Sequence, residues 1–265
     1  MSEQIRCSVV IPTKNSAEGL PILLESVKDF SDVAICDGWS EDNTREVASA
    51  FGARVEMQDR RFLNDDGTIK DFAGIRNQCT DIAREKWVLN IDTGDFLGES
   101  FGDELRKVID SGVIGAFWIN RIFVYGRTVI ECASNYPSRQ IRLYHKDAVV
   151  TWIKPIHERV ELKPGITAQI FPASLYTPMM ATIAELKKKW SDYIALECAR
   201  KHDYSFRTWL RHTLREGALA VLFLFRIVRV RLFCRGTKQP ITIELMRLWY
   251  QWKLLTELLR KVRRL

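Results

Sequence analysis

Residues 7 to 95 alternate short apolar runs with stretches of helical hydrophobic spacing, and this alternation constrains the fold more than any other feature. Residues 7 to 12 form a β-branched run, and a helix-like stretch follows from about residue 18 to 30. The same order returns with residues 33 to 36 as a strand and residues 42 to 51 as a helix. Strands that alternate with helices indicate a mainly parallel sheet flanked by helices.

The alternation continues to a fourth strand. The pattern predicts a strand at residues 54 to 57, a helix at 70 to 84, and a strand at 87 to 91 that ends in the polar turn 92 to 95. Sheets of this kind bind ligands beyond the carboxyl ends of their strands. Because polar turns follow the strands at that edge, we expect the functional site there.

The middle of the chain changes character. Residues 116 to 125, 128 to 133 and 140 to 144 are predicted as three strands joined by tight turns. We expect them to add antiparallel strands to the sheet. The predicted fold class is therefore α/β, a mainly parallel sheet flanked by helices with antiparallel additions.

The last third of the chain is basic. Residues 180 to 265 carry 19 Lys and Arg against 7 Asp and Glu, although the whole chain has a net charge of only +7. This part is predicted to be helical, with long helices at 206 to 233 and 243 to 265. We therefore expect a catalytic domain at residues 1 to 179 and a basic amphipathic helical region at 180 to 265.

Membrane contact is the expected role of these helices, since basic, Trp-rich amphipathic helices commonly lie in the membrane interface. The uncharged run at residues 217 to 225 is much shorter than the roughly 20 residues that span a bilayer. Helix packing or a homo-oligomer seam is the alternative. A nucleic-acid partner is not expected, because Trp209, Trp249 and Trp252 recur with Leu and Val at helical spacing rather than as a base-stacking platform.

The six cysteines are scattered, without a C-x-x-C pair, which predicts reduced thiols in a cytosolic chain. The start of the sequence has no hydrophobic signal region, so secretion through a cleaved signal is not expected. The expected location is cytoplasmic, peripheral on the cytoplasmic face of the cell membrane.

Asp92 and Asp95 end the fourth predicted strand and are the strongest single chemical signal. Carboxylates suit Mg²⁺ or Mn²⁺, and such an ion can neutralise a diphosphate leaving group. The same four residues also fit a simple tight turn. They match the Ile-Asp-Thr-Gly of aspartic proteases too, but those enzymes need a second carboxylate from a second copy or a dimer and an all-β body, and the chain has no second copy.

Four ordered motifs resemble family 2 glycosyltransferases, which have a GT-A fold: CSVVIPTKN, CDGWSEDNT, FAGIRNQCTDIA and KWVLNIDTGDF. The stretch RQIRLYHKDAVVTWIKPIHE, residues 139 to 158, further resembles the subgroup related to lipopolysaccharide-core glycosyltransferases. The resemblance covers about residues 7 to 160 and leaves out the helical tail. It implies that a sugar is transferred from a nucleotide diphosphate donor.

The resemblance also implies roles for residues along the first two strands. Pro12, Thr13 and Asn15 would form the first nucleotide-contacting loop, and Asp37 would contact the base. The alternative for Asp37, as for Asp42, is that it caps the helix that follows.

Further along, the resemblance implies that Arg76, with Asn77 beside it, reaches the diphosphate, and that Asp92 lies near the ribose or a metal. Arg76 could instead be a solvated helix residue. Family members usually have Asp-x-Asp, but Gly94 stands at the second aspartate position here. The expected metal ligand therefore shifts to Asp95.

Inversion at the anomeric carbon requires a base for the acceptor hydroxyl. The candidate is Glu158, in a loop-like stretch beyond the strands that would wall the acceptor site. His157 could complete the metal shell or bind phosphate. Glu131 and Asp147 are the rival candidates for the base.

The predicted function is an inverting glycosyltransferase that uses a lipid-linked or cell-envelope glycan acceptor. A polyprenyl-phosphate glycosyltransferase is a close alternative, because an acceptor that is already an anion needs no strong base. The alternative outside enzymes is a non-catalytic membrane-surface protein that retains the fold. Dinucleotide-binding and P-loop motifs do not occur in the sequence.

Overall fold

The computed structural model describes residues 3–179, 182–200 and 204–262. The chain forms two compact units. One consists of residues 1–122 and 137–177, and the other of residues 123–136 and 178–265. The segment 123–136 thus groups with the helices, and the predicted division into a catalytic domain and a basic helical region after residue 179 stays a prediction.

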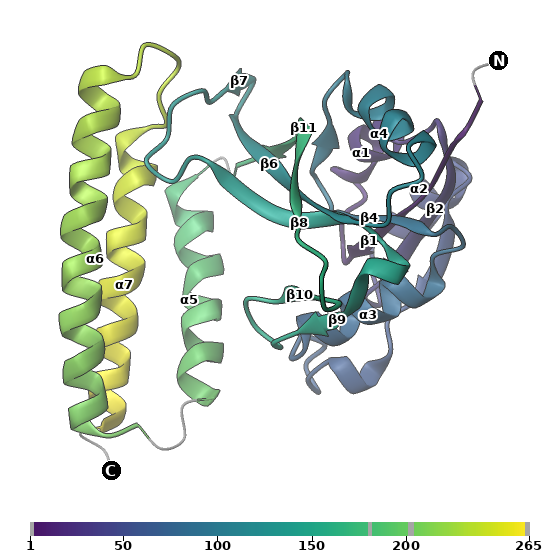
Figure 1. The fold of residues 1–265 in the computed structure, drawn as a ribbon. Coiled ribbons are helices and arrows are strands. Elements are labelled where there is room, and N and C mark those ends of the chain that lie inside the picture. The colour runs from purple at the N-terminus through teal and green to yellow at the C-terminus, as the bar shows by residue number, and fades with distance from the viewer. Residues whose placement is uncertain (1–2, 180–181, 201–203, 263–265) are drawn as a thin grey trace. The chain divides into compact units, whose positions relative to one another are not determined.

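The first unit is built on a mixed sheet, seen in Figure 1. The first four strands of the alternation are parallel neighbours in the order β3-β2-β1-β4. From β4 the sheet continues as β8-β6-β11-β5, and the pairs β4 with β8, β8 with β6, and β11 with β5 are antiparallel. The predicted fold class is confirmed. The strands are β1 (Ile5–Thr13), β2 (Phe30–Asp37), β3 (Arg54–Met57), β4 (Trp87–Asn90), β5 (Phe96–Leu97), β6 (Ala116–Tyr125), β8 (Ser138–His145) and β11 (Gln169–Pro178).

Helices cover both faces of this sheet, which explains why β1 is buried at nearly every position. Successive side chains of a strand point to opposite faces. Val9 thus packs in one core with α1 (Leu20–Ser26) and α4 (Phe101–Asp110), whereas Val10 packs in the other core with α3 (Phe72–Ile82).

Two further elements complete the first unit. Helix α2 (Thr44–Ala50) follows β2 and packs against α1 and β3. Strands β9 (Val149–Ile153) and β10 (Arg159–Leu162) pair with each other as a separate antiparallel ribbon, and β9 packs against α3. The ribbon brings the region of Glu158 to the helix that carries Arg76.

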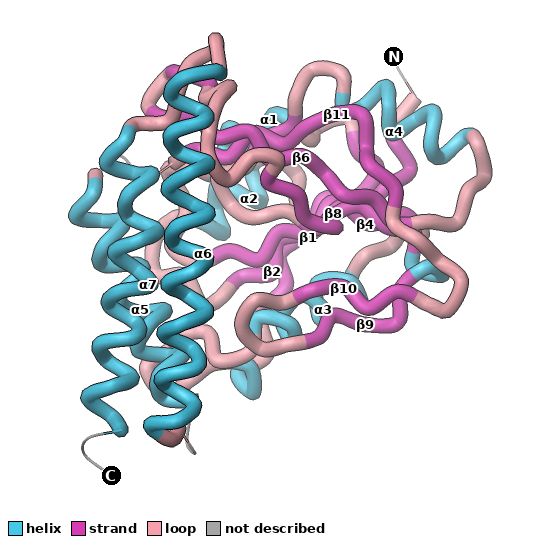
Figure 2. Tube along the Cα trace, turned by 60° about the vertical axis from the view of Figure 1, so that its left-hand side comes forward, coloured by secondary structure: helices cyan, strands magenta, loops and turns pink. Residues whose placement is uncertain are grey.

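The second unit contains α5 (Ile183–Arg200), α6 (Phe206–Phe233) and α7 (Ile241–Val262), and Figure 2 shows these helices side by side. α7 packs against both α5 and α6. The helix predicted at residues 206 to 233 is confirmed residue for residue, whereas the end of the last predicted helix, residues 263–265, lies outside the described residues. Within the described part of the chain, none of the helices is both long and apolar enough to cross a bilayer.

The prediction of a strand at residues 128 to 133 is wrong beyond residue 129. Strand β7 covers only Thr128–Val129 and pairs with β6. Beyond it, the backbone of Cys132 bonds to the carbonyl group of Thr237 and the N–H of Gln239. A partner more than a hundred residues away thus takes the backbone bonds that a longer hairpin would have used.

The expectation of reduced thiols is wrong for two cysteines. Cys132 and Cys234 form a disulfide with their Cα atoms 6.2 Å apart, across 102 residues of sequence. The remaining cysteines, at positions 7, 36, 79 and 198, are outside disulfides. The spacing of the six cysteines held no signal for this pair, because residues 132 and 234 meet only through the fold of the second unit.

Candidate active site

The carboxyl ends of β1 and β4 meet at one edge of the sheet, and the polar turns that follow them are joined by hydrogen bonds. The Thr93 hydroxyl lies 2.9 Å from the Thr13 hydroxyl and 3.1 Å from the carbonyl oxygen of Pro12. Asp92 and Thr93 therefore stand beside the first loop, as the sequence predicted for a site at this edge.

Asp92 is the centre of an ion-pair cluster. One of its carboxylate oxygens accepts a hydrogen bond from Arg76, and the other accepts one from Arg142 at 2.9 Å. Both guanidinium groups are buried, whereas 38% of the Asp92 side chain is exposed. A carboxyl oxygen of Glu158 lies 3.4 Å from the same nitrogen of Arg76. The structure thus brings together Arg76, Asp92 and Glu158, which the sequence predicted, with an arginine that it did not.

Burial and neighbouring charges shift the pKa values of this cluster. Burial alone would raise the pKa of Asp92, but Arg142 and Arg76 hold it well below its usual value. Burial alone would lower the pKa of Arg76, but Asp92 and Glu158 raise it above its usual value. Burial and the nearby charge of Arg76 lower the pKa of Arg142 to about 10, so this guanidinium is still cationic at neutral pH.

The β9–β10 ribbon is fixed to α3 by Asn77. Its side-chain amide donates to the carbonyl oxygen of Trp152 at 3.0 Å and accepts from the Trp152 N–H at 2.8 Å. Trp152 in turn lies under both arginines, with its ring centre 5.6 Å from the Arg76 guanidinium and 5.9 Å from that of Arg142. The Arg76–Glu158 contact therefore depends on the amide of Asn77 and the ring of Trp152.

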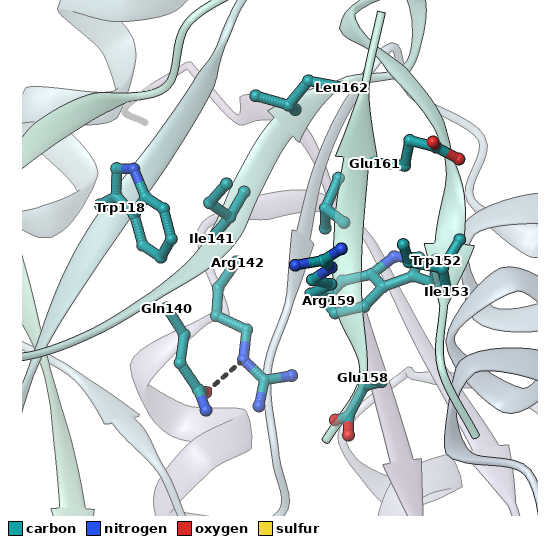
Figure 3. A pocket seen from close by; sticks show the side chains of 11 residues that line it. Trp118, Gln140, Ile141, Arg142, Trp152, Ile153, Glu158, Arg159, Glu161 and Leu162 are labelled. Carbon is teal, nitrogen blue, oxygen red and sulfur yellow. Dashed lines mark hydrogen bonds between the residues drawn. The ribbon is translucent and has the colours of Figure 1, made fainter. Parts of the chain in front are cut away.

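Two cavities meet the cluster. A cavity of about 190 Å³ at the ends of the parallel strands is lined by Pro12, Thr13, Lys14, Gln58, Ile69, Phe72, Ile75, Arg76, Asp92 and Thr93. A larger cavity of about 390 Å³ lies between β8 and the ribbon, and Figure 3 shows the Arg142 guanidinium pointing across it toward Glu158. Its lining is Trp118, Gln140, Ile141, Arg142, Trp152, Ile153, Glu158, Arg159, Val160, Glu161 and Leu162.

Comparison with known proteins identifies the family. The model of glycosyl transferase family 2 matches residues 8–153, which is more than half of the chain. The chain belongs to glycosyl transferase family 2. The GT-A fold expected from the motifs is confirmed by this match and by the sheet, whereas the lipopolysaccharide-core subgroup stays a prediction.

Individual family relatives are distant. An uncharacterized glycosyltransferase of Rickettsia bellii is 30% identical over 114 residues, which cover 42% of this chain and 36% of that protein. The chain thus spans about a third of the curated relatives it matches. The crystal structure of S. aureus TarS with UDP-GlcNAc has a TM-score of 0.49 at 16% identity and covers 73% of this chain and 65% of that one. A Mycobacterium tuberculosis glucosyl-3-phosphoglycerate synthase, crystallised with Mn²⁺ and UDP, has a TM-score of 0.33 at 19% identity and covers 46% and 45%.

In this family 2 chain, Asn15 and Asp37 hold the first two turns together. The Asp37 carboxylate is fully buried and accepts from the backbone N–H of Ser40 at 2.9 Å and from the Ser40 hydroxyl. The Ser40 hydroxyl accepts from the N–H of Asn15, and the Asn15 side chain accepts from the N–H of Glu41 at 2.8 Å. Asp37 thus anchors the loop in this structure, and its contact with a nucleotide base stays a prediction.

Gln58, which follows β3, is a candidate donor-site residue that sequence reasoning missed. Its amide nitrogen donates to the carbonyl oxygen of Cys36 at 2.9 Å, which orients the side chain. Its buried carbonyl oxygen has no hydrogen-bond partner within the part of the chain that the structure describes, yet Gln58 lines the smaller cavity. A buried acceptor without a partner is costly, so a ligand N–H is a natural partner for it. No motif in the sequence marked this position.

Arg142 is the second missed residue. It lay inside the Arg-Leu-aromatic strand that carried the subgroup resemblance, but the strand pattern gave no reason to choose this arginine over Arg139. Its Nε donates to Gln140 at 2.9 Å, and its buried Nη1 has no partner among the described residues. The register of β8 against β4 places Arg142 beside Asp92, and only the fold shows this register.

The predicted metal ligands do not fit a divalent cation as they are arranged. Both carboxylate oxygens of Asp92 are bound by arginines, and Asp95 is 5% exposed, with Thr177 and Arg121 as neighbours. His157 adjoins Glu158 at a positive φ of 56°. Across residues 3–179, 182–200 and 204–262, no group of three or more His, Cys, Asp or Glu side chains is placed to hold a metal ion.

The rival candidates for the base, Asp147 and Glu131, contact other groups. Asp147 is 3.6 Å from Lys86 and 3.7 Å from His145, in the turn after β8. Glu131 accepts from the backbone N–H of Thr237 at 2.7 Å in the second unit. Neither residue is in the lining of the two cavities described above.

Proposed function

We propose that this chain transfers a sugar from a nucleotide diphosphate to an acceptor, with inversion at the anomeric carbon. The observation that carries the proposal is the convergence of Arg76 and Arg142 on Asp92, which links a cavity at the strand ends, lined by Arg76 and Asp92, to a second cavity lined by Arg142 and Glu158. This arrangement supplies cations for a leaving group and a carboxyl group for an acceptor.

The donor would occupy the smaller cavity. Pro12, Thr13 and Lys14 line it from the first loop, and Gln58 offers an acceptor for an N–H of the base. Arg76 and Arg142 would stabilise the negative charge that develops on the leaving diphosphate. Buried cations that are already oriented act strongly on such charge, because they need no reorganisation during the reaction.

The acceptor would occupy the larger cavity, where Glu158 would take the proton of its hydroxyl group. The acceptor oxygen then bonds to the anomeric carbon while the bond from that carbon to the diphosphate oxygen breaks, and the nucleotide diphosphate leaves with the electron pair. Trp118 and Trp152 offer apolar surface to a sugar ring beside these polar groups. If Glu158 is the base, Glu158→Gln lowers kcat by about 10²-fold to 10⁴-fold.

A second candidate is a transferase whose acceptor is a phosphate, such as a polyprenyl phosphate. The buried Nη1 of Arg142, which has no partner in the described part of the chain, favours it because a phosphate oxygen would supply one. Near-full activity of Glu158→Gln would select this reaction, since a phosphate acceptor needs no base.

A requirement for Mg²⁺ or Mn²⁺ stays a prediction, and no step of the reaction proposed above depends on it. A lipid-linked or cell-envelope glycan remains the proposed hydroxyl acceptor, and peripheral membrane contact through the C-terminal helices accompanies that choice.

A donor screen tests the proposed function. Release of the nucleotide diphosphate is measured for the full chain with a panel of UDP-, GDP- and deoxynucleotide-linked sugars, with Mn²⁺ or with a chelator. We expect release with at least one donor and its loss in Arg76→Gln. If calorimetry detects no binding of these donors or of their nucleotide diphosphates, the transferase proposal is rejected and the non-catalytic alternative is favoured.

A further inference from the structure

Helix α6 (Phe206–Phe233) has two apolar faces, and the structure accounts for one of them. That face packs along α7. The Trp209 indole N–H donates to the carbonyl oxygen of Leu255 at 2.9 Å, and Gln251 donates to Glu216 at 3.0 Å. Further along, Phe223 and Ile227 are buried, and the Arg247 guanidinium lies 5.0 Å from the Phe223 ring centre.

The second apolar face is exposed. Its residues recur at steps of three, four and seven, which places them on one side of a helix. Each is between 43% and 70% exposed, although all are large and apolar. We call this set the α6 outer face; it comprises Leu210, Leu214, Val221, Phe225, Val228 and Leu232.

The outer face runs along most of a helix of 28 residues. At 1.5 Å per residue, the span from Leu210 to Leu232 is about 33 Å. Residues 217–225 in its middle are uncharged, with exposed arginines on both sides of that run. Figure 2 shows α6 as one continuous helix within its unit, so this face is not interrupted by a kink.

The charge on α6 is strongly one-sided. The helix contains six arginines and one acidic residue, Glu216, which contacts Gln251 and His212. Arg211 and Arg215 are exposed before the uncharged middle, and Arg226 and Arg229 are exposed after it. Long cationic side chains can extend from an apolar surface to reach anionic groups at its border.

We propose that the α6 outer face docks on the surface of a lipid bilayer that contains anionic lipids. The apolar side chains enter the boundary between headgroups and acyl chains, and the arginines contact lipid phosphates. α6 lies along the surface rather than across it, since none of the described helices is apolar enough to span a bilayer.

A second copy of this chain fits the outer face less well. Helices that pair along such a seam use opposite charges beside it to select a partner. On α6, Arg211 and Arg229 stand beside the seam, whereas Glu216, the one acidic residue of the helix, lies on the side that packs along α7. Two copies would therefore bring arginine against arginine, whereas an anionic bilayer offers the opposite charge.

This inference deepens the proposed function, because a membrane surface is where a lipid-linked acceptor is found. Vesicle binding requires neither a donor nor an intact active site. Failure of the docking proposal and failure of the transferase proposal are therefore separate results.

Co-sedimentation of the full chain with vesicles tests the docking. The vesicles are pure phosphatidylcholine, or phosphatidylcholine with roughly one third phosphatidylglycerol. We expect binding to the anionic vesicles to fall at least about tenfold in the combined variant Leu214→Gln, Phe225→Gln and Leu232→Gln. The control variant Val150→Gln with Ile170→Gln changes apolar residues of similar exposure, 55% and 54%, in the other unit and retains binding.

Two outcomes would overturn the proposal. One is equal binding of the outer-face variant and the unaltered chain, or equal binding to neutral and anionic vesicles. The other is a dimer in light scattering that the outer-face variant converts to a monomer, which would assign this face to a second copy. Circular dichroism checks that each variant is folded, and since the substituted side chains are exposed, we expect unchanged helix content.

Discussion

At the scale of single residues, the site is defined by which charges share a partner. Arg76 was predicted from a motif on a helix, but its partners Asp92 and Glu158 lie 16 and 82 residues away in the sequence. Local patterns placed Asp92 at the end of a strand and Glu158 in a loop. They could not show that one carboxylate serves two arginines, because that depends on the register of β8 against β4.

Gln58 gives a prediction about donor recognition. Its buried carbonyl oxygen lacks a partner within the described residues, and Gln58 lines the proposed donor cavity. We expect Gln58→Met to weaken nucleotide diphosphate binding about tenfold, the value of one hydrogen bond, with little change in kcat. Titration calorimetry measures the affinity; an unchanged Kd would remove Gln58 from the donor site.

Asp95 gives a prediction about pH. Burial, followed by the charge of Asp92, raises the pKa of Asp95 from 3.8 to about 6. The folded protein therefore holds this proton more tightly than the unfolded chain. The resulting stabilisation is complete below about pH 4 and is lost as the pH rises through about 6.

Asp95→Asn keeps the side chain neutral at every pH. The shift corresponds to roughly 3 kcal/mol, so we expect the variant to be more stable than the unaltered chain at pH 7.5 by up to that amount. At pH 4 the two should unfold at similar temperatures. Thermal unfolding of both proteins at pH 4 and pH 7.5 measures the difference in stability. An equal difference at the two pH values would show that the raised pKa of Asp95 is not its cause.

At the scale of elements, the helices were predictable where the chain supplies its own signal. α6 (Phe206–Phe233) begins after Ser205, whose side chain accepts from the Thr208 N–H, and its periodic apolar residues mark its full length. β7 was predicted too long, because its neighbours in sequence bond to residues 237–239 instead of continuing a hairpin. Backbone pairing between residues about a hundred positions apart produces no periodic pattern in the sequence.

The disulfide gives a prediction at this scale. Cys132–Cys234 closes a loop of about 100 residues, for which chain entropy predicts up to about 4–5 kcal/mol of stabilisation. Reduction should therefore lower the unfolding temperature of the helical unit. Thiol titration in denaturant without reductant should find four thiols, and six after reduction.

Six thiols before reduction would contradict the disulfide. The same count bears on location, since disulfides persist in oxidising compartments and are rare in the cytosol. The expected cytoplasmic location remains a prediction. Counting the thiols of protein isolated from cells without reductant would test it.

At the scale of the whole molecule, the sequence was sufficient for the class of the first unit and for the helical character of the second. Alternating strands and helices predicted the parallel strands, and the charge imbalance marked the tail. The pattern could not show that residues 123–136 belong with the helices. That association rests on contacts such as the bond from the Ser134 N–H to Glu244 at 3.0 Å, between residues that are 110 positions apart.

The central claim is that the arginines bound to Asp92 hold the diphosphate of a nucleotide donor. Calorimetry with UDP and GDP, and with uridine and guanosine, tests it most directly when Arg142→Gln is compared with Arg139→Gln, an exposed arginine of the same strand. The account predicts that Arg142→Gln weakens binding of the preferred nucleotide diphosphate at least about tenfold and leaves nucleoside binding unchanged, while Arg139→Gln alters neither. Equal diphosphate affinity in the two variants would contradict it.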